Sequence, residues 1–493
     1  MISCWLGAIV LCLAAPPSDP KWAVPAWDAV IDRALDRWQV PGAAVIVVTR
    51  DRVLYLGGRG VRAAGKPERM TPDTIFPIAS CSKAFTTTLL AMLVDDKKVD
   101  WDDPVRKHLK EFHLADPLAD GDVRLRDLVS HRTGVAGHDL LWYRAAWDTD
   151  EMIRRVGILP LSQPFRTKMQ YQSIMFTAAG KFAGNASGKP WAELVEDRIF
   201  KPLEMKSAGV TSTKAHKNAD LALPHRIGKK GPEAMPSYPM PDPNPAGSIH
   251  LSARDLAPWL QLHLNEGTHG EARLVSEKSL KETRAPQIVI SMDEETRAIH
   301  PFTEQMCYGM AWVIQDYRGE LLVSHAGLSE GFRAHFTLLP RRGLAIGVLA
   351  NLDRTRFNLA LSNEIVDTML KAPAHDWHDL YRKQADAEEF AAKVRATQIE
   401  RNRKRGTKPT LPLEAYVGTF EEPAYGTAKI SLKDDHLFLH WSSFNCQLEH
   451  FENDTFRVLD EMLGDTPLRF HLKNGNLEAM TAMDVKFARQ LEK

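Results

Sequence analysis

The sequence has no excess of charge of either sign, and this absence narrows the range of partners. Lys and Arg together number 63, Asp and Glu together also number 63, and the formal net charge is therefore zero. A neutral chain has no global field that would attract a polyanion or an anionic membrane surface. We therefore expect no nucleic-acid partner.

Cysteine is scarce, with 5 residues in 493. Beyond the first 15 residues only Cys81, Cys307 and Cys446 remain, and they lie far apart. Three widely spaced cysteines exclude a disulfide framework and a metal site of the C-x-x-C kind. The sequence also lacks a phosphate loop, a dinucleotide fingerprint and an H-E-x-x-H motif. We therefore expect no metal and no cofactor.

Long hydrophobic runs are absent except at the N-terminus, where residues 5–14 are apolar and are followed by Pro16 and Pro17. This run has the length of a signal-peptide core and is too short to span a bilayer. We predict that residues 1–15 are a signal peptide, that the mature chain is secreted or periplasmic, and that it has no membrane span. Because no Lys or Arg precedes the run, a buried helix or an uncleaved anchor remains an alternative.

The length and composition are those of a folded chain with more than one part. A length of 493 residues allows about three domains, and 44% hydrophobic with 26% charged residues is typical of globular proteins. Hydrophobic periodicity predicts a helix over 27–38 and another from residue 80, with strands over 43–49, 53–56, 321–324, 334–339 and 344–350. The strands come from both ends of a helical middle, so we expect a mixed α/β fold.

Two further segments follow this α/β part. Residues 376–408 are polar and helix-prone, which predicts a helical linker. We interpret its basic end, at residues 401–405, as a helix C-terminus and not as a nucleic-acid patch. From residue 411 to residue 493 the apolar segments are short and separated by turns. This pattern predicts a separate C-terminal β domain.

The first candidate catalytic residues along the chain are Ser80 and Lys83. If Ser80 opens a helix, Lys83 lies one turn later on nearly the same face, where an amine can take the serine proton and make the hydroxyl a nucleophile. Backbone N–H groups at a helix start would also face the negatively charged oxygen that forms when the serine attacks a carbonyl group. The only other S-x-x-K in the chain runs from Ser18 to Lys21, contains a proline and adjoins the predicted cleavage site, so we do not expect it to be catalytic.

The surroundings of Ser80, residues 74–85, resemble the nucleophile segment of the penicillin-recognising serine hydrolases, in the branch of class C β-lactamases, D-Ala-D-Ala carboxypeptidases and related esterases. Further family landmarks occur in the family's order at residues 40–42, 102–105, 128–134, 246–248, 252–256 and 308–312. The resemblance implies a catalytic domain over 22–371, built of an antiparallel sheet flanked by helices and an all-helical lobe, with the site in the cleft between them. Residues 411–493 resemble the lipocalin-like β-barrel that often follows such domains, and we expect it to cap or narrow the cleft or to dock a partner.

The resemblance also assigns roles to residues. Tyr171-Gln172-Ser173 matches the family's Tyr-x-Asn motif, which makes Tyr171 a general base or proton relay beside Lys83. Ser173 departs from the family's asparagine, since a hydroxyl cannot offer both a carbonyl and an NH₂ group. The sequence therefore weakens the prediction of a β-lactam or D-Ala-D-Ala substrate.

The third family motif is matched by His325-Ala326-Gly327. Gly327 lets a substrate pass close to the strand, and the resemblance implies that the N–H of Leu328 forms the oxyanion hole together with the N–H of Ser80. Histidine in place of lysine removes a permanent cation that would attract a substrate carboxylate, unless the histidine is protonated. This second departure also favours neutral esters or small amides.

A competing motif overlaps this region, because residues 327–331 read Gly-Leu-Ser-Glu-Gly and satisfy the G-x-S-x-G nucleophile elbow. That elbow requires a following helix, whereas residues 332–339 alternate like a strand.

We therefore predict an exported serine hydrolase that forms an acyl-enzyme on Ser80 and cleaves ester or small amide and peptide bonds, of the esterase, D-aminopeptidase or carboxypeptidase type. A weakly catalytic acyl-binding sensor or scaffold, a true β-lactamase and a cell-surface interaction protein remain alternatives, and the sequence predicts no oligomeric state.

Overall fold

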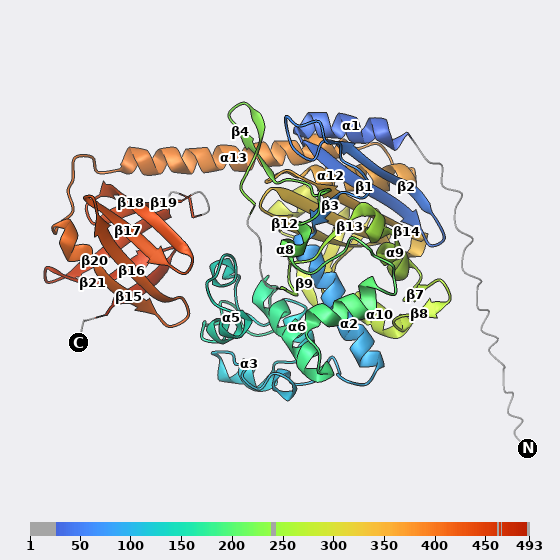
Figure 1. The fold of residues 1–493 in the computed structure, drawn as a ribbon, viewed down its shortest axis with the longest axis horizontal. Coiled ribbons are helices and arrows are strands. Elements are labelled where there is room, and N and C mark those ends of the chain that lie inside the picture. The colour runs from blue at the N-terminus through green and yellow to red at the C-terminus, as the bar shows by residue number, and fades with distance from the viewer. Residues whose placement is uncertain (1–25, 238–242, 461–462, 465, 491–493) are drawn as a thin grey trace, which may run out of the picture.

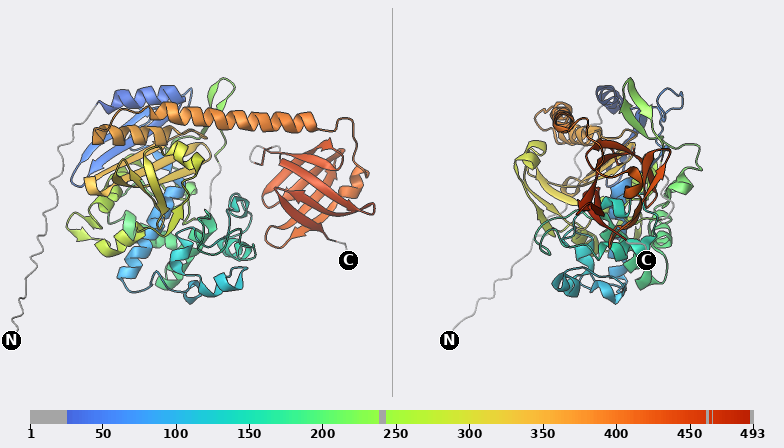
Figure 2. Two further views of the ribbon diagram at one scale, coloured as in Figure 1. Left: turned by 180° about the vertical axis from the view of Figure 1, so that it is seen from behind. Right: turned by 90° about the vertical axis from the view of Figure 1, so that its left-hand side faces the viewer.

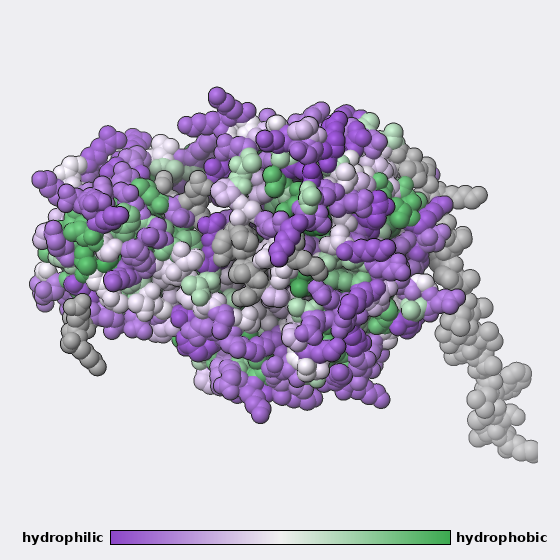
Figure 3. Space-filling model, viewed as in Figure 1, coloured by the Kyte–Doolittle hydropathy of each residue, from purple (hydrophilic) through white to green (hydrophobic). Residues whose placement is uncertain are grey.

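The computed structural model describes residues 26–237, 243–460, 463–464 and 466–490 (Figure 1). The predicted signal peptide lies outside these residues. Within the described part of the chain, no helix is both long enough and apolar enough to cross a membrane. The face of the molecule drawn in Figure 3 is mostly hydrophilic, with small scattered hydrophobic patches.

The domain that the resemblance predicts to be catalytic, called the catalytic part below, is built on one eight-stranded sheet whose neighbouring strands are all antiparallel. In sheet order the strands are β2 (Val53–Gly60), β1 (Gly42–Thr49), β14 (Leu344–Ala350), β13 (Phe332–Leu339), β12 (Glu320–Ser329), β11 (Val313–Tyr317), β10 (Thr303–Tyr308) and β9 (Ile288–Ile290). β1 therefore lies between β2 and β14, the last strand of this sheet along the chain, which confirms that the sheet is assembled from both ends of this part of the sequence.

Helices cover both faces of this sheet, which explains why β1 reads as an unbroken apolar run with every residue buried. Alternate side chains of β1 enter two different cores. Ala43, Val45 and Val47 pack with α1 (Trp27–Trp38) and α12 (Phe357–Leu370), while Ala44, Ile46 and Val48 pack with α2 (Ser82–Asp95) and α9 (Ala253–Leu264).

A mainly helical lobe lies below the sheet in Figure 1. It contains α3 (Pro117–Asp122), α4 (Leu125–Leu128), α5 (Thr149–Val156), α6 (Ser173–Ser187) and α7 (Trp191–Val195). Shorter elements complete the catalytic part: α8 (Ser212–Ala215), α10 (Glu277–Thr283), α11 (Glu294–Ile299), and the strand pairs β3 (Ile75–Pro77) with β6 (His250–Ser252), β4 (His225–Gly228) with β5 (Gly231–Ala234), and β7 (Thr268–His269) with β8 (Ala272–Arg273). The lobe joins the sheet through α2, which packs against α6 and α7.

A long helix, α13 (Trp377–Asn402), runs from the catalytic part to the C-terminal domain (Figures 1 and 2). Its first turns are anchored by Trp377, His378 and Tyr381, which are buried. The rest of the helix is largely exposed, including Phe390. This element lies where the sequence predicts a helical linker.

The C-terminal domain is a closed eight-stranded antiparallel barrel, which confirms the predicted β-barrel. Its strands are β15 (Gly418–Glu422), β16 (Gly426–Lys433), β17 (His436–Trp441), β18 (Phe444–Glu452), β19 (Thr455–Leu459), β20 (Thr466–Lys473), β21 (Asn476–Ala482) and β22 (Val485–Arg489). The apolar segments that the sequence marks, at 416–420, 428–432, 437–441, 456–459 and 468–472, correspond to the other five strands, whereas β18, β21 and β22 have no such segment. Their inward positions alternate with outward Asn, Gln, Glu and Lys side chains, so each carries a weaker apolar signal than the other strands.

The barrel also contacts the helical lobe directly. An Nη1 atom of Arg155 in α5 donates to the carbonyl oxygen of Ala424 at 2.8 Å, and the rings of Trp147 and Trp441 lie 6.1 Å apart in an edge-to-face arrangement. These contacts are additional to the covalent connection through α13.

Candidate active site

Ser80 lies in a short 3-10 turn, η1 (Ala79–Cys81), between β3 and the start of α2. Ala79 has a φ angle of +46°, a conformation that is strained for a residue with a side chain and that cannot belong to an α-helix. Ser80 and Cys81 complete the 3-10 turn, so the α-helix begins at Ser82 and not at Ser80 as the sequence suggested. The 3-10 turn leads directly into α2, so Lys83 still lies on the same side as Ser80.

Lys83 is fully buried and surrounded by oxygen atoms. Its Nζ atom lies 3.1 Å from the Oγ atom of Ser80, 3.4 Å from the Oγ atom of Ser173 and 2.9 Å from the carbonyl oxygen of Ala246. Burial lowers the pKa of Lys83 to about 7, while the charge of Asp139 acts weakly in the opposite direction. At neutral pH a large fraction of Lys83 is therefore the free amine that can take a proton from Ser80.

Tyr171 precedes α6 and has an exposed fraction of 39%. The Nζ atom of Lys83 lies 5.0 Å from the centre of its ring. Although part of the side chain is exposed, the hydroxyl end is shielded from water, which raises the pKa of Tyr171 above its usual range, and a hydrogen bond with Ser80 opposes this shift. Tyr171 therefore keeps its proton at neutral pH and is better suited to donate one than to act as a phenolate base.

Ser173 is the first residue of α6, and Gln172 caps this helix. The Oε1 atom of Gln172 accepts from the N–H of Ile174 at 2.8 Å, and its Nε2 atom donates to the carbonyl oxygen of Ala136 at 2.7 Å. The middle residue of the Tyr-x-Asn-like motif is therefore a structural anchor. It fixes the backbone on which Tyr171 and Ser173 are presented.

His325 lies in β12 and is buried, and both of its ring nitrogens are hydrogen-bonded. The Nδ1 atom lies 2.7 Å from the carbonyl oxygen of Ala326, which can only accept, so Nδ1 carries the proton. The Nε2 atom therefore accepts from the hydroxyl of Tyr308, 3.0 Å away. Burial lowers the pKa of His325 to about 3, with a further contribution from the charge of Lys83. His325 is thus a neutral residue held in one tautomer.

Gly327 shows why this motif requires a glycine. A Cβ atom at this position would lie 2.1 Å from the carbonyl oxygen of Ile78, so β12 passes directly against the backbone that leads to Ser80. The next residue, Leu328, has a side chain that is 60% exposed. Ser329 ends β12, and the chain turns into strand β13 rather than a helix. The nucleophile-elbow interpretation of residues 327–331 is therefore excluded.

Three residues beside these groups received no role from the sequence. His131 contacts the rings of Tyr171 and Tyr308 at centroid distances of 4.1 and 4.8 Å, and its Nδ1 atom accepts from the N–H of Gln172 at 3.2 Å. Burial, together with the charge of Lys83, keeps the pKa of His131 well below its usual value. His131 and Tyr308 belong to family landmarks, which was the available signal. Asp139 belongs to no landmark and had no signal.

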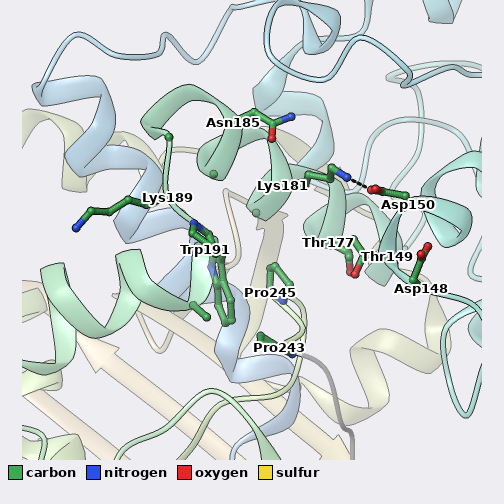
Figure 4. Close-up of a pocket in the computed structure, with 15 residues that line it drawn as sticks. Asp148, Thr149, Asp150, Thr177, Lys181, Asn185, Lys189, Trp191, Pro243 and Pro245 are labelled. Carbon is green, nitrogen blue, oxygen red and sulfur yellow. Dashed lines mark ion pairs between the residues drawn. The ribbon is translucent and has the colours of Figure 1, made fainter.

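An open cavity of about 810 Å³ lies on the other side of α6 (Figure 4). Its wall includes Thr177, Lys181, Trp191 and Pro245, and Figure 4 shows Lys181 paired with Asp150 across it. None of the predicted site residues lines this cavity. The backbone just after Pro245 separates it from Lys83, since the carbonyl of Ala246 is a partner of the lysine.

Comparisons with known proteins match both domains of the chain. The family model described as Beta-lactamase matches residues 27–367, and the model described as Domain of unknown function (DUF3471) matches residues 402–493. A curated relative, Unguisins hydrolase ungD' of Aspergillus campestris (strain IBT 28561), is 28% identical over 445 residues, which cover 85% of this chain and 80% of the relative.

An esterase and a solved penicillin-binding protein homologue are also similar to this chain. Esterase EstB of Burkholderia gladioli is 29% identical over 267 residues, which cover 50% of this chain and 66% of the esterase. The solved structure of the octameric penicillin-binding protein homologue from Pyrococcus abyssi aligns with a TM-score of 0.60 at 18% identity, covering 93% of this chain and 98% of that one. The last likeness shows that the fold extends through both domains.

Proposed function

Since the chain belongs to the Beta-lactamase family, we propose that it is an exported serine hydrolase that cleaves ester or small amide and peptide bonds through an acyl-enzyme on Ser80. The hydrolase class follows from the family and from relatives named as a hydrolase and an esterase. The identity of the nucleophile, the substrate class and the export are the parts that we propose. Export rests on the apolar run at residues 5–14.

The acylation step uses the contacts around Lys83. The Oγ atom of Ser80 attacks the substrate carbonyl carbon while its proton passes to the neutral amine of Lys83, 3.1 Å away. Tyr171, which keeps its proton, gives it to the leaving alcohol or amine and is reprotonated from Lys83. The carbon–leaving-group bond breaks, and the acyl group remains on Ser80. Water then attacks the ester carbon while Lys83 accepts the water proton. The bond between the acyl carbon and the Oγ atom of Ser80 breaks, Lys83 returns the proton to that Oγ atom, and the acid leaves.

The oxyanion formed in both steps requires N–H donors. We assign this role to the backbone N–H groups of Ser80 and Leu328, because Gly327 brings β12 against the segment that ends at Ser80. One such donor is worth about 3 kcal/mol of transition-state stabilisation. This arrangement uses no metal and no cofactor.

The polar groups near Ser80 favour a substrate without a carboxylate at the position that penicillin-like substrates use. His325 is neutral, since burial lowers its pKa to about 3, and it therefore offers no cation. Ser173 still reaches Lys83, at 3.4 Å, but has no amide for an acyl-amide group. Both observations support an esterase or amidase over a β-lactamase.

The single observation that carries the proposal is the contact between the Nζ atom of Lys83 and the Oγ atom of Ser80, combined with the burial that lowers the pKa of that lysine to about 7. A turnover panel of the mature chain tests it, with short acyl esters, D-alanyl peptides and a cephalosporin as substrates. We expect ester or amide cleavage, no cephalosporin turnover, and loss of activity in Ser80→Ala. Unchanged activity in Ser80→Ala would overturn the proposal, and labelling of Ser80 without turnover would favour the sensor alternative.

A further inference from the structure

A segment of the helical lobe, residues 136–147, passes directly beside Tyr171. The carbonyl of Ala136 accepts from the side chain of Gln172 at 2.7 Å, and a side chain on Gly137 would come within 3.0 Å of the carbonyl oxygen of Tyr171. Asp139 follows two residues later, at the start of the 3-10 turn η3 (Asp139–Leu141), and is exposed. Asp139 is therefore an exposed acidic residue on the segment that passes beside Tyr171.

Asp139 has no ion-pair partner among the residues that the structure describes. Its Oδ1 atom accepts from the Nε1 atom of Trp142 at 2.8 Å, which leaves most of the acceptor capacity of the carboxylate unused. A nearby guanidinium, that of Arg144, is instead paired with Glu330 at 3.4 Å. The negative charge of Asp139 acts on the reacting groups, since it opposes the lowering of the Lys83 pKa by burial and adds a minor contribution to the raised pKa of Tyr171.

The other ionisable groups around Ser80 leave this negative charge uncompensated. His131 and His325 are held neutral by burial, and Lys83 has a pKa near 7 and is enclosed by three oxygen atoms. Among these four groups of the described residues, Asp139 is the exposed one, and its charge is negative. A substrate carboxylate would be repelled there, whereas a substrate cation would be attracted.

The barrel holds the segment in place from the other side. His138 is hydrogen-bonded through Nδ1 to the hydroxyl of Tyr425, 2.7 Å away, and Glu422 accepts from the N–H of Tyr425 at 2.6 Å. Near the end of the segment, the N–H of Ala146 donates to the Oγ atom of Ser442 at 3.0 Å. Two barrel turns therefore fix the residues that flank Asp139, as a binding site that must be preorganised requires.

We propose that Asp139 binds a positively charged group of the substrate, and that the enzyme selects acyl donors with a free ammonium group close to the scissile carbonyl, such as esters and amides of amino acids. This inference rests on the proposed function, since it names the substrate class of the same site. Asp139 binds the substrate and takes no part in the covalent steps.

The test compares two isosteric substrates of the full mature chain, alanine p-nitroanilide and 2-methylpropanoic p-nitroanilide, in which a methyl group replaces the ammonium group. Both alanine enantiomers are assayed, with p-nitrophenyl acetate as a neutral ester. The variant Asp139→Asn removes the charge and keeps an acceptor for Trp142. Asp148→Asn is the matched control, because it removes an exposed charge nearby while asparagine still caps α5.

We expect the wild-type chain to prefer the alanine substrate by about ten- to a hundredfold in kcat/KM, as for a hydrogen bond between charged groups. Asp139→Asn should lose this preference, mainly through KM, and Asp148→Asn should keep it. The preference of the wild-type chain should also fall as salt is added, because the ammonium group is attracted by an exposed charge.

Two results overturn the inference alone: wild-type turnover of the neutral ester with no preference for the ammonium substrate, or a preference that persists in Asp139→Asn. Absence of turnover of every substrate, with no labelling of Ser80, would overturn the proposed function as well. The two failures are therefore distinguishable.

Discussion

Tyr308, the last residue of β10, donates a hydrogen bond across 3.0 Å to the Nε2 atom of His325 in β12, although β11 lies between these two strands in the sheet. The other ring nitrogen of His325 is bound to the carbonyl of Ala326. Protonation of Nε2 would reverse the hydrogen bond with Tyr308, whose hydroxyl oxygen can also accept, but burial lowers the pKa of His325 to about 3. The residue that replaces the family's lysine is therefore a fixed neutral group and not a pH-dependent cation.

The variant Tyr308→Phe tests this relationship. It leaves the Nε2 atom of a buried imidazole without a donor, which we expect to lower the free energy of unfolding by about 1–3 kcal/mol. Urea unfolding measures this change, and Tyr55→Phe, whose hydroxyl contacts Asp28 at an exposed site, is the control with an expected change close to zero. Equal effects of the two substitutions would contradict the account.

The pH dependence of turnover follows from Lys83. Since burial lowers its pKa to about 7, the amine is protonated below that pH and cannot accept the Ser80 proton. We expect kcat/KM for a neutral ester to rise about tenfold per pH unit below pH 7 and to level off above it. His325 contributes no change in this range, because its pKa is lowered to about 3. A profile that falls as the pH rises from 6 to 8 would contradict the role of Lys83.

Replacement of Lys83 by alanine tests whether Lys83, and not another titrating group, causes the pH dependence of turnover. We expect Lys83→Ala to lower kcat/KM by about 10²- to 10⁴-fold, the usual contribution of a general base, and to remove the rise near pH 7. Ester hydrolysis assays at a series of pH values measure both the loss of kcat/KM and the loss of the rise near pH 7. A variant that keeps the same rising profile would show that another group is the base.

The close approach of β12 to the nucleophile predicts a sharp effect of Gly327→Ala. The added methyl group meets the carbonyl oxygen of Ile78 at 2.1 Å, so one of the two backbones must shift. We expect a loss of about 1–3 kcal/mol of stability and a larger loss of kcat, because the shifted strand carries the N–H of Leu328. Gly121→Ala is the control, since nothing lies within 4 Å of the added atom there, and an equal loss of kcat in both variants would refute the argument.

The barrel is expected to influence substrate binding through Tyr425. The variant Tyr425→Phe removes the hydrogen bond with His138 and frees the segment that carries Asp139. We predict a KM for the ammonium substrate that rises several-fold, with a smaller change in kcat and a change of about 1 kcal/mol or less in stability. An unchanged KM would mean that the barrel does not position this segment.

Much of this arrangement could be predicted from the sequence, because some signals are local. The apolar periodicity of residues 27–38 marks a helix that the structure has over the same residues, and the unbroken apolar run of β1 marks a strand buried on both faces. The spacing of Ser80 and Lys83 also survives the shift of the helix start by two residues, since one turn separates them in either form.

Other features depend on contacts between residues far apart in the chain. The carbonyl of Ala246 near Lys83, the pairing of Tyr308 with His325 and the position of Asp139 beside Tyr171 have no local pattern. The choice between Tyr171 and Lys83 as the base could not be made either, because it depends on burial in the folded chain. Weakly alternating strands such as β21 escape notice for a different reason, since barrel closure and not their own apolar content fixes them.

The most direct test of the central claim is the mass of the chain after reaction with a fluorophosphonate, followed by identification of the labelled peptide. The account predicts one label, on Ser80, which is lost in Ser80→Ala, strongly slowed in Lys83→Ala and retained in Ser329→Ala. A label on another residue, or one that persists in Ser80→Ala, would contradict the assignment of Ser80 as the nucleophile.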